Sequence, residues 1–469
     1  MIKIAVSSGD PSGIGPDICI KAFSNFHSMN CCPIIFGNIN LFKERAEMLK
    51  TKVEIEEYKG EEASLLKRDK LWIVNSDIDT TITPGKPDIK AAKYIIETFK
   101  NSVKRTLKKE LNISSSLLNS FTTNYKYSFK KNIIKKYQNC KCINLIGMGG
   151  SILGTEAIHD FLKFKIKKKI KFFNNLNNQI KLESNRKSIN LIVSKSGNTL
   201  ETISNFNLIL KNKNKNKNIF ITENKTSFLT LLAKKLKAEI VEHKNYIGGR
   251  YSVLSEVGML PAQLLGLNEA KFKRFNNLIQ NKSFLNSLIT NVSFISKCVS
   301  QGKKNSVILN YDESSENLFK WYQQLTAESL GKKNKGIFPI ISSMPKDNHS
   351  LLQLYLDGPK NNFFTFFGVL NEKTNYLDNS NLFRNFSNLK NKSLSQIAQA
   401  QRQATQIVFK KKKIPFRSIE VLKKNEETIG ELFSFFVLET ILLGRVMKVN
   451  PFDQPAVELI KTETSKILN

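Results

Sequence analysis

Histidine, cysteine and tryptophan are scarce in this chain, with four, six and two residues in 469. The cysteines, Cys19, Cys31, Cys32, Cys140, Cys142 and Cys298, form neither a CxxC pair nor a zinc-ligand spacing. We therefore expect free thiols, no metal site and a reducing, cytoplasmic location. The first residues, "MIKIAVSSGD", contain no apolar run typical of a signal peptide.

Long uninterrupted apolar runs are also missing. The most apolar late segment, "GELFSFFVLETILLGRVM", is interrupted by Glu431 and Glu439 and contains Arg445. This pattern predicts a buried helix, because a membrane span needs about 20 apolar residues with few charges. We expect no membrane association.

Acidic residues are outnumbered by basic ones, 40 to 73, giving a formal net charge of +33. Such an excess is compatible with nucleic-acid binding. However, the lysines are spread along the whole chain, without a zinc-finger, helix-turn-helix or RNP-type motif. We therefore expect a basic solvated surface, no specific nucleic-acid partner and a general attraction for anions such as sugar phosphates.

Strand-turn-helix signals recur in three series, beginning with "IKIAVSS", "CINLIGMGGSILG" and "NSVILNYDE". Strands that alternate with helices predict α/β units with parallel sheets. A polar stretch from about residue 87 to 135 indicates a helix and an irregular join between modules, and "KNKNKNKN", residues 211–218, is typical of a solvated loop.

Two turns in the second series follow strand candidates, where parallel sheets bind ligands. The first is "GMGGSILG", whose glycines would let the backbone approach an anion at a helix N-terminus, although such loops are often only tight turns. The second is "SKSGNTLET", with Ser194, Lys195, Ser196, Thr199 and Thr202. One hydroxyl would explain a helix cap, whereas four favour a phosphate ligand.

Six motifs in order carry a family resemblance from about Ile143 to the C-terminus. They are "GMGGSILG", "SKSGNTLET", "IGGRYSVLSEVGMLPA", "WYQQLTAESLGK", "KDNHSLLQLYLDGP" and "NPFDQPAVELIK". Together they resemble the glucose-6-phosphate isomerase family, whose members have two sugar-isomerase (SIS) domains. The resemblance implies two flavodoxin-like, parallel-sheet βαβ domains, preceded here by a partial α/β module. We expect domains over residues 143–275 and 276–440, with a C-terminal segment over 441–469.

An aldose and a ketose interconvert by moving a proton between C1 and C2, which requires a base over both carbons and a cation beside the enediolate. Glu328 is the candidate base, and Gln324 lies on the same side of a predicted helix. Alone, Glu328 would be interpreted as an exposed helical carboxylate. The resemblance implies that Glu328 transfers the proton and that Arg250 stabilises the enediolate. Without the resemblance, Arg250 would be interpreted as part of a buried structural ion pair.

The resemblance also assigns the remaining site residues. It implies ring opening by His349 with Lys461, a sugar contact at Gln454, and Gly150 and Ser151 lining the sugar. It places the five polar residues of "SKSGNTLET" on the phosphate, and it implies a homodimer in which His349 is contributed across the subunits. It implies no cofactor. On its own, Lys461 would be interpreted as a surface lysine.

One departure concerns substrate choice. Many members of the family carry Phe and an additional Thr where this chain has "SKSGNT", and "SGNT" resembles SIS proteins that isomerise both glucose and mannose phosphates. The alternatives to a glucose-6-phosphate isomerase are therefore a dual phosphoglucose/phosphomannose isomerase and a sugar-phosphate-binding SIS protein without catalysis. The joint presence of Glu328, His349 and Lys461 argues against the last of these.

The first 104 residues carry a second resemblance. "SSGDPSGIGPDICIKAF", "PIIFGNINLFKERAEML" and "TPGKPDIKAAKYIIETF" resemble the start of the 4-hydroxythreonine-4-phosphate dehydrogenase family. That family binds a divalent metal through histidines later in its chain, and residues 105–142, an expected linker, contain no histidine. We therefore expect no working dehydrogenase site, with residual dehydrogenase activity as an alternative. The segment is interpreted as a structural replacement for the isomerase N-terminus, a fusion remnant or the product of a misjoined reading frame.

Overall fold

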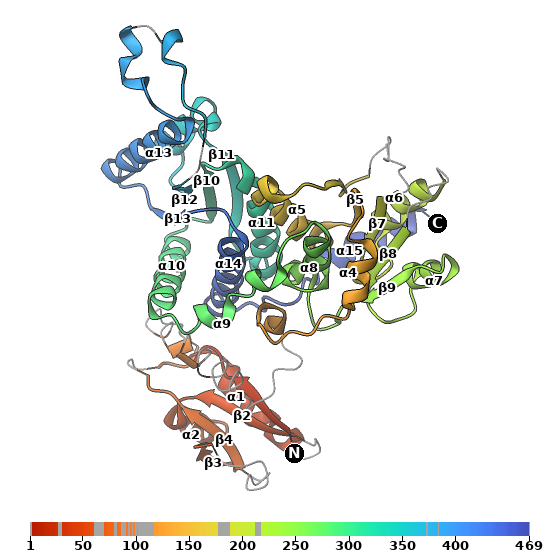
Figure 1. Cartoon of the computed structure of the whole chain (residues 1–469). Helices are drawn as coiled ribbons and strands as arrows, with labels where there is room; N and C mark the ends of the chain where they lie inside the picture. Colours follow the sequence, from red (N-terminus) through yellow and green to blue (C-terminus); the bar gives the residue numbers. More distant parts are fainter. Residues whose placement is uncertain are drawn as a thin grey trace.

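The computed structural model describes residues 2–26, 31–60, 70–78, 82–85, 91, 94–95, 97–98, 101, 117–176, 188–211, 217–371, 374–382 and 384–468. Most of the polar join and most of the lysine-asparagine stretch expected to be a loop lie outside these residues. The described residues form three parallel sheets, in agreement with the α/β prediction (Figure 1).

The N-terminal module is a four-stranded parallel sheet with the order β1-β2-β4-β3. Its elements are β1 (Ile2–Ser7), α1 (Gly15–Phe26), β2 (Cys31–Gly37), α2 (Ile39–Met48), β3 (Glu54–Glu57) and β4 (Lys70–Asn75). Alternate residues of β2 and β4 point to opposite faces, so Ile34 and Trp72 join one small core and Ile35 and Leu71 the other. In Figure 1 this sheet projects below the rest of the molecule.

The second sheet has five parallel strands in the order β6-β5-β7-β8-β9, the flavodoxin-like order. Three of its strands are tied by a ladder of buried amides, in which Asn144 donates to Asn190 (2.9 Å) and Asn190 donates to Asn218 (2.8 Å). The strands and helices are α4 (Lys131–Tyr137), β5 (Cys142–Ile146), α5 (Leu153–Phe161), β6 (Lys169–Phe173), β7 (Ser188–Val193), α6 (Leu200–Lys211), β8 (Lys217–Thr222), α7 (Phe228–Lys235), β9 (Glu239–Glu242) and α8 (Glu256–Leu264).

The third sheet has four parallel strands in the order β11-β10-β12-β13. Its elements are α9 (Phe275–Leu278), α10 (Lys282–Ser300), β10 (Asn305–Asn310), α11 (Glu316–Leu330), β11 (Phe338–Ser343), α12 (Leu352–Asp357), β12 (Asn362–Val369), α13 (Leu394–Lys411), β13 (Phe416–Val421), α14 (Glu426–Val446) and α15 (Val457–Leu468). Helix α11 packs against α5 of the second sheet and against α14, so it joins the two halves.

Helix α14 confirms the buried helix predicted from the apolar segment. Its interior contains Glu439, which is fully buried, pairs with Arg417 and accepts a hydrogen bond from the Tyr322 hydroxyl (2.9 Å). The charge is therefore satisfied inside the protein. Within the described residues, no helix is long and apolar enough to cross a membrane.

The structure also shows how the expected segments meet. Helix α14 runs across residue 440, where a boundary was expected, and α9 runs across residue 275. Part of the expected linker is packed, since Phe121, in a short 3-10 helix over Leu117–Phe121, is fully buried in the main core. Tyr94, from the end of the N-terminal region, joins the same core.

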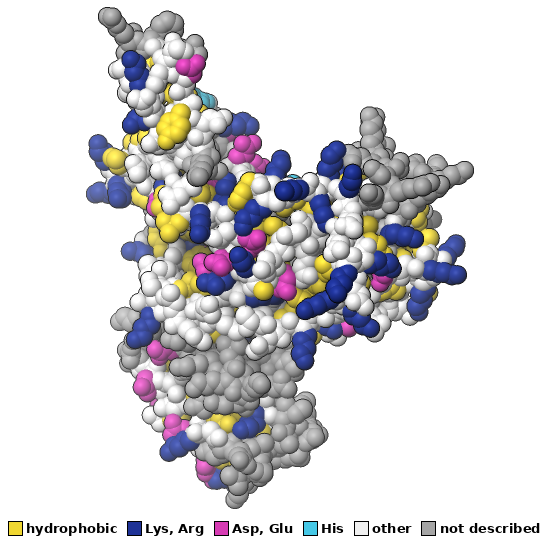
Figure 2. Space-filling model, in the orientation of Figure 1, with side chains coloured by type: hydrophobic (Ala, Val, Ile, Leu, Met, Phe, Trp, Pro, Cys, Tyr) yellow, Lys and Arg dark blue, Asp and Glu magenta, His cyan; other side chains and the backbone are white. Residues whose placement is uncertain are grey.

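Basic side chains are scattered over the molecule. Figure 2 shows Lys and Arg spread over the face that it draws, with acidic side chains among them, and no single continuous basic groove. This distribution fits a solvated basic surface.

Candidate active site

The site lies between the carboxyl ends of β5 and β7 and helix α11. The turn after β5 carries Gly150, and a Cβ atom there would stand 2.2 Å from the carbonyl carbon of Gly249. Only glycine permits this approach of two backbones. The turn thus packs directly against the 3-10 helix Gly249–Leu254, which carries Arg250.

Arg250 is buried and held on every side. Its Nε donates to Ser329 Oγ (2.8 Å) and its Nη2 to the carbonyl oxygens of Pro451 (2.6 Å) and Asp453 (3.0 Å). Its Nη1 donates to Gln454 Oε1 (2.5 Å) and to Glu328 Oε2 (3.2 Å). The guanidinium therefore has a fixed orientation, with one edge toward the carboxylate of Glu328.

Glu328 and Gln324 lie one helical turn apart on α11. Gln324 Nε2 donates to Glu328 Oε1 at 2.9 Å, so each oxygen of the carboxylate has one donor. The Glu328 side chain is 26% exposed, which leaves it open to a ligand. Gln324 also reaches the turn after β5, since a Cβ atom at Gly149 would lie 2.7 Å from its Nε2.

The hydroxyl-rich turn follows β7, next to the turn after β5. A Cβ atom at Gly147 would lie 3.2 Å from the carbonyl oxygen of Val193, so the two turns are neighbours. Ser194 Oγ and Thr199 Oγ1 are 2.8 Å apart, and Ser194 Oγ accepts from the Gly197 amide (3.1 Å). Ser196 Oγ accepts from the Asn198 amide at 3.2 Å.

Thr202 completes this turn with a buried hydroxyl. Its Oγ1 has no hydrogen-bond partner within the described part of the chain. Ser151, on the neighbouring turn, is half-buried. The structure thus brings Gly150, Gln324, Glu328, Arg250 and Gln454 together, with the hydroxyl turn beside them.

Lys195 points away from the hydroxyls of its own turn. Its ammonium donates to the carbonyl oxygen of Asn245 (2.8 Å) and lies 3.6 Å from Glu223. Burial lowers the pKa of Lys195, an effect that Glu223 partly offsets. A role on a phosphate would require the side chain to turn.

His349 and Lys461 are exposed, and within the described part of the chain neither makes a hydrogen bond or ion pair with the other site residues. His349 ends the short 3-10 helix Lys346–His349 after β11. Lys461 lies on α15 and pairs with Glu458 one turn away (2.6 Å). No described residue of α15 is buried.

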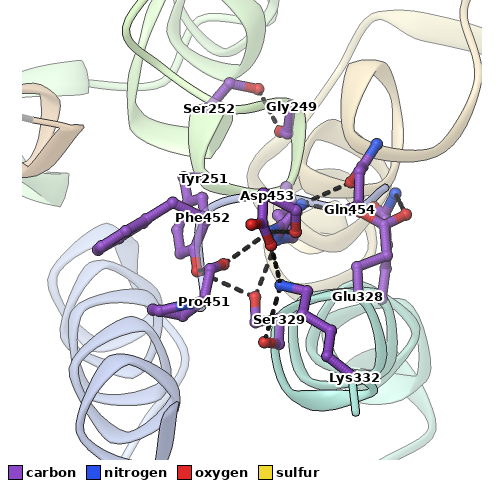
Figure 3. Close-up of polar contacts among 12 residues, drawn as sticks. Gly249, Tyr251, Ser252, Glu328, Ser329, Lys332, Pro451, Phe452, Asp453 and Gln454 are labelled. Carbon is purple, nitrogen blue, oxygen red and sulfur yellow. Dashed lines mark hydrogen bonds and ion pairs between the residues drawn. The ribbon is translucent and has the colours of Figure 1, made fainter. Parts of the chain in front are cut away.

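Several residues that the sequence did not single out support the site. Ser329 is fully buried and contacts both Arg250 and the Tyr251 hydroxyl (2.9 Å). Lys332 pairs with Asp453 (2.9 Å) and so holds the C-terminal segment against α11 (Figure 3). The sequence signal that could have identified these residues is their position beside Glu328 in "ESLGK" and beside Gln454 in "PFDQP". Among the described residues, no group of His, Cys, Asp and Glu could hold a metal ion.

Comparisons with known proteins agree with this geometry. The family model of phosphoglucose isomerase matches residues 133–469. The chain is 35% identical over 341 residues to glucose-6-phosphate isomerase of Methanocaldococcus jannaschii, covering 69% of this chain and 82% of the relative. It is 31% identical over 362 residues to glucose-6-phosphate isomerase of Campylobacter jejuni, covering 72% and 87%.

Two solved structures share the fold. The hypothetical protein TT0462 of Thermus thermophilus superposes with a TM-score of 0.70 and 23% identity, covering 81% of this chain and 96% of that one. A glucose-6-phosphate isomerase of Chlamydia trachomatis superposes with a TM-score of 0.63 and 18% identity, covering 80% and 86%. The match of the family model and the identity to the curated relatives show that the chain belongs to the phosphoglucose isomerase family.

Proposed function

We propose that this chain is a glucose-6-phosphate isomerase that interconverts glucose 6-phosphate and fructose 6-phosphate. The observation that carries the proposal is the partly exposed carboxylate of Glu328, held by Arg250 and Gln324 beside a turn rich in hydroxyls. A positioned base, a fixed cation and an anion-binding turn are the parts that an enediol mechanism on a sugar phosphate needs.

The proposed chemistry moves the C2 proton to C1 and the O2 hydroxyl proton to O1. Glu328 takes the proton from C2 of the open aldose, and the electron pair forms the C1–C2 double bond while the C1 carbonyl electrons move to O1, giving an enediolate. The hydroxyl proton of O2 passes to O1, and the carboxylic acid of Glu328 then returns its proton to C1 as the C2 carbonyl forms. The negative charge that develops on the sugar oxygens lies next to Arg250, whose fixed orientation requires no reorganisation during the reaction. The reverse reaction uses the same groups.

The phosphate would occupy the hydroxyl turn. Ser194, Ser196, Thr199 and Thr202 supply hydroxyls, and backbone amides at the start of α6 add donors and a partial positive charge. Gly197 has φ +70, and a Cβ atom there would lie 2.1 Å from Ser227 Oγ, so the turn depends on glycine. Lys195 would leave Asn245 to reach the phosphate.

The proposal also includes ring opening by His349 with Lys461. It further includes a homodimer in which His349 of one subunit reaches the active site of the other. The exposure of both side chains supports a role at a subunit boundary. Gln454 would contact the sugar after releasing Arg250, and Gly150 and Ser151 would line it.

The N-terminal module, which resembles the start of the dehydrogenase family, is proposed to have a structural role. Its packing through Tyr94 into the isomerase core supports this role. We also propose a cytoplasmic location, since no two of the described cysteines form a disulfide.

The test is incubation of the purified full chain with fructose 6-phosphate, with and without EDTA, and separate quantification of glucose 6-phosphate and mannose 6-phosphate. We expect glucose 6-phosphate to form at the same rate with and without EDTA. Comparable production of mannose 6-phosphate would favour the dual isomerase. Binding of fructose 6-phosphate without either product would contradict the proposal.

A further inference from the structure

A cavity of about 490 Å³ lies where the N-terminal module meets the isomerase region. Its wall includes Ser7 and Gly9 from the N-terminal module, Tyr246 and Tyr251 from the segment after β9, and Ile441 and Arg445 from α14. A volume of this size is within the range of small-molecule sites. The residues of the proposed proton transfer, Glu328 and Arg250, are not part of its wall.

The electrostatics of this cavity favour an anion. Arg445 and Lys195 both line it, whereas none of the described lining residues is Asp or Glu. Arg445 has no hydrogen-bond or ion-pair partner among the described residues, although protein surrounds it closely enough to lower its pKa by desolvation. Arg445 is exposed to solvent, so its guanidinium is accessible to a ligand.

The loop "GDPSGIG" of the N-terminal module contributes Gly9 to the wall beside Arg445. Gly9 has φ +73, and a Cβ atom there would lie 3.5 Å from Arg445 Nη1, so the backbone at Gly9 runs beside the guanidinium. Asp10, the carboxylate of this loop, is turned back onto its own chain and accepts from the Ser12 amide (2.9 Å) and hydroxyl (2.7 Å). It therefore does not neutralise Arg445.

The loop is also held in place from within its own module. Arg45 of α2 donates to the carbonyl oxygens of Pro11 and Gly13, each at 3.2 Å. A Cβ atom at Gly15 would lie 1.9 Å from the carbonyl oxygen of Ser8, which shows how tightly the loop folds back. The backbone of the loop that follows Gly9 is thus held in place by contacts within the N-terminal module.

Much of the remaining wall is apolar, although Ser7, Asn245 and Tyr246 also line it. The apolar part includes Ile95, Leu117, Leu118, Ile441, Leu442 and Phe452, together with the ring of Tyr251. Two basic side chains beside a largely apolar wall suit a ligand with one anionic group and an apolar body.

We propose that this cavity binds a small organic anion whose charged group pairs with Arg445. The ligand would be a monophosphate or a carboxylate with an aromatic or branched aliphatic body. The cavity borders the proposed sugar-phosphate site and shares Lys195 with it, but neither Glu328 nor Arg250 lines the cavity, and the proposal does not depend on the isomerase activity. It gives the N-terminal module a ligand-binding role shared with α14.

The test measures binding of phenyl phosphate to the full chain by isothermal titration calorimetry, with phenol and inorganic phosphate as controls for the body and the charge. We expect phenyl phosphate to bind more tightly than either control. Arg445→Gln should weaken it at least about tenfold, as loss of a charge-assisted hydrogen bond predicts, and Arg445→Lys should weaken it less. Ser194→Ala with Thr199→Ala should leave it unchanged.

A second variant, Leu442→Phe, narrows the cavity without altering its charge and should also weaken binding. Thermal unfolding checks that each variant is folded, and the rate with fructose 6-phosphate gives a second check for the Arg445 and Leu442 variants. The proposal is overturned if phenyl phosphate does not bind at millimolar concentration, if Arg445→Gln and Leu442→Phe both bind as the parent does, or if binding is lost only in the Ser194/Thr199 variant. That last result would place the probe in the sugar-phosphate site.

Discussion

The two sheets of the isomerase region differ in the partners of the hydrogen-bond donors at the carboxyl ends of their strands. In the β10–β13 sheet, Asp347 accepts from Ser342 Oγ (2.9 Å), the Ser343 amide (2.8 Å) and Ser350 Oγ (3.0 Å). In the β5–β9 sheet, the corresponding hydroxyls of Ser194 and Thr199 contact each other.

A second carboxylate strengthens the contrast. Asp312, after β10, is buried and accepts from Ser314, Ser315 and Lys424. No hydroxyl of the turn after β7 is bonded to a carboxylate in the described part of the chain. The β10–β13 half thus carries its own anions, whereas the β5–β9 half leaves donors for an anion from outside.

The largest effect is expected for the base beside the open turn. Glu328→Gln keeps the shape and the Gln324 contact but removes the proton acceptor, so kcat should fall at least ~100-fold while KM changes little. Steady-state kinetics with fructose 6-phosphate measure both. Glu316→Gln, on the same helix in an exposed pair with Lys320, is the matched control and should keep the parent rate. A Glu328→Gln enzyme with near-parent kcat would remove this residue from the mechanism.

The next effect concerns the turn itself. Ser194→Ala with Thr199→Ala removes two hydroxyl donors to a dianion, and KM should rise roughly 10- to 100-fold. The matched variant is Ser342→Ala in the other sheet, which contacts Asp347 and should leave KM unchanged. If both variants raised KM equally, the two turns would not differ in function.

Asp347→Ala should act on stability. It leaves three donors without their acceptor, and the free energy of unfolding should fall by about 1–3 kcal/mol. Urea denaturation of the full chain measures this loss, and the KM of the folded enzyme should be unchanged. An equal loss of stability in the Ser194/Thr199 variant would show that the open turn is structural as well.

The contrast extends to buried cations, where the smallest effect is expected. Arg417 is paired with Glu439, whereas among the described residues Lys273 donates to the carbonyl oxygens of Ser120 and Leu254 alone and lies over the rings of Tyr125 and Tyr127. Burial lowers the pKa of Lys273 to about 7. Above that pH the unfolded chain holds a proton that the folded chain has lost, so stability should rise with pH.

This dependence is measured by urea denaturation between pH 7 and 8.5. The slope for the parent should exceed that for Lys273→Met by about 1 kcal/mol per pH unit. Parallel slopes for the two proteins would show that Lys273 stays charged in the fold. Because Leu254 ends the 3-10 helix that carries Arg250, the variant's kcat would also report whether Lys273 positions that helix.

The sequence predicted the parallel α/β architecture and the buried helix α14, because short apolar runs followed by amphipathic helices are local patterns. It did not predict β3, β6 or β13, which lie at the edges of their sheets. Edge strands such as "EIEE" carry charges on their open side, and this weakens the alternating apolar signal.

The candidate site followed the same rule. Glu328, Arg250 and the turns came from motifs, and the structure brings them together. The direction of Lys195 toward Asn245 and the support of Arg250 by Ser329 and Pro451 depend on contacts between segments distant in sequence. Sequence patterns carry little information on such contacts. For the same reason, the sequence did not distinguish the turn after β11, whose donors bond to Asp347, from the turn after β7, whose hydroxyls bond to no carboxylate among the described residues.

The most direct measurement is a crystal structure of the full chain with fructose 6-phosphate bound. We expect the phosphate oxygens within hydrogen-bonding distance of Ser194 and Thr199, with C1 and C2 of the sugar beside the Glu328 carboxylate. A phosphate seated elsewhere, with Ser194 and Thr199 still bonded to each other and Glu328 away from the sugar carbons, would contradict the account.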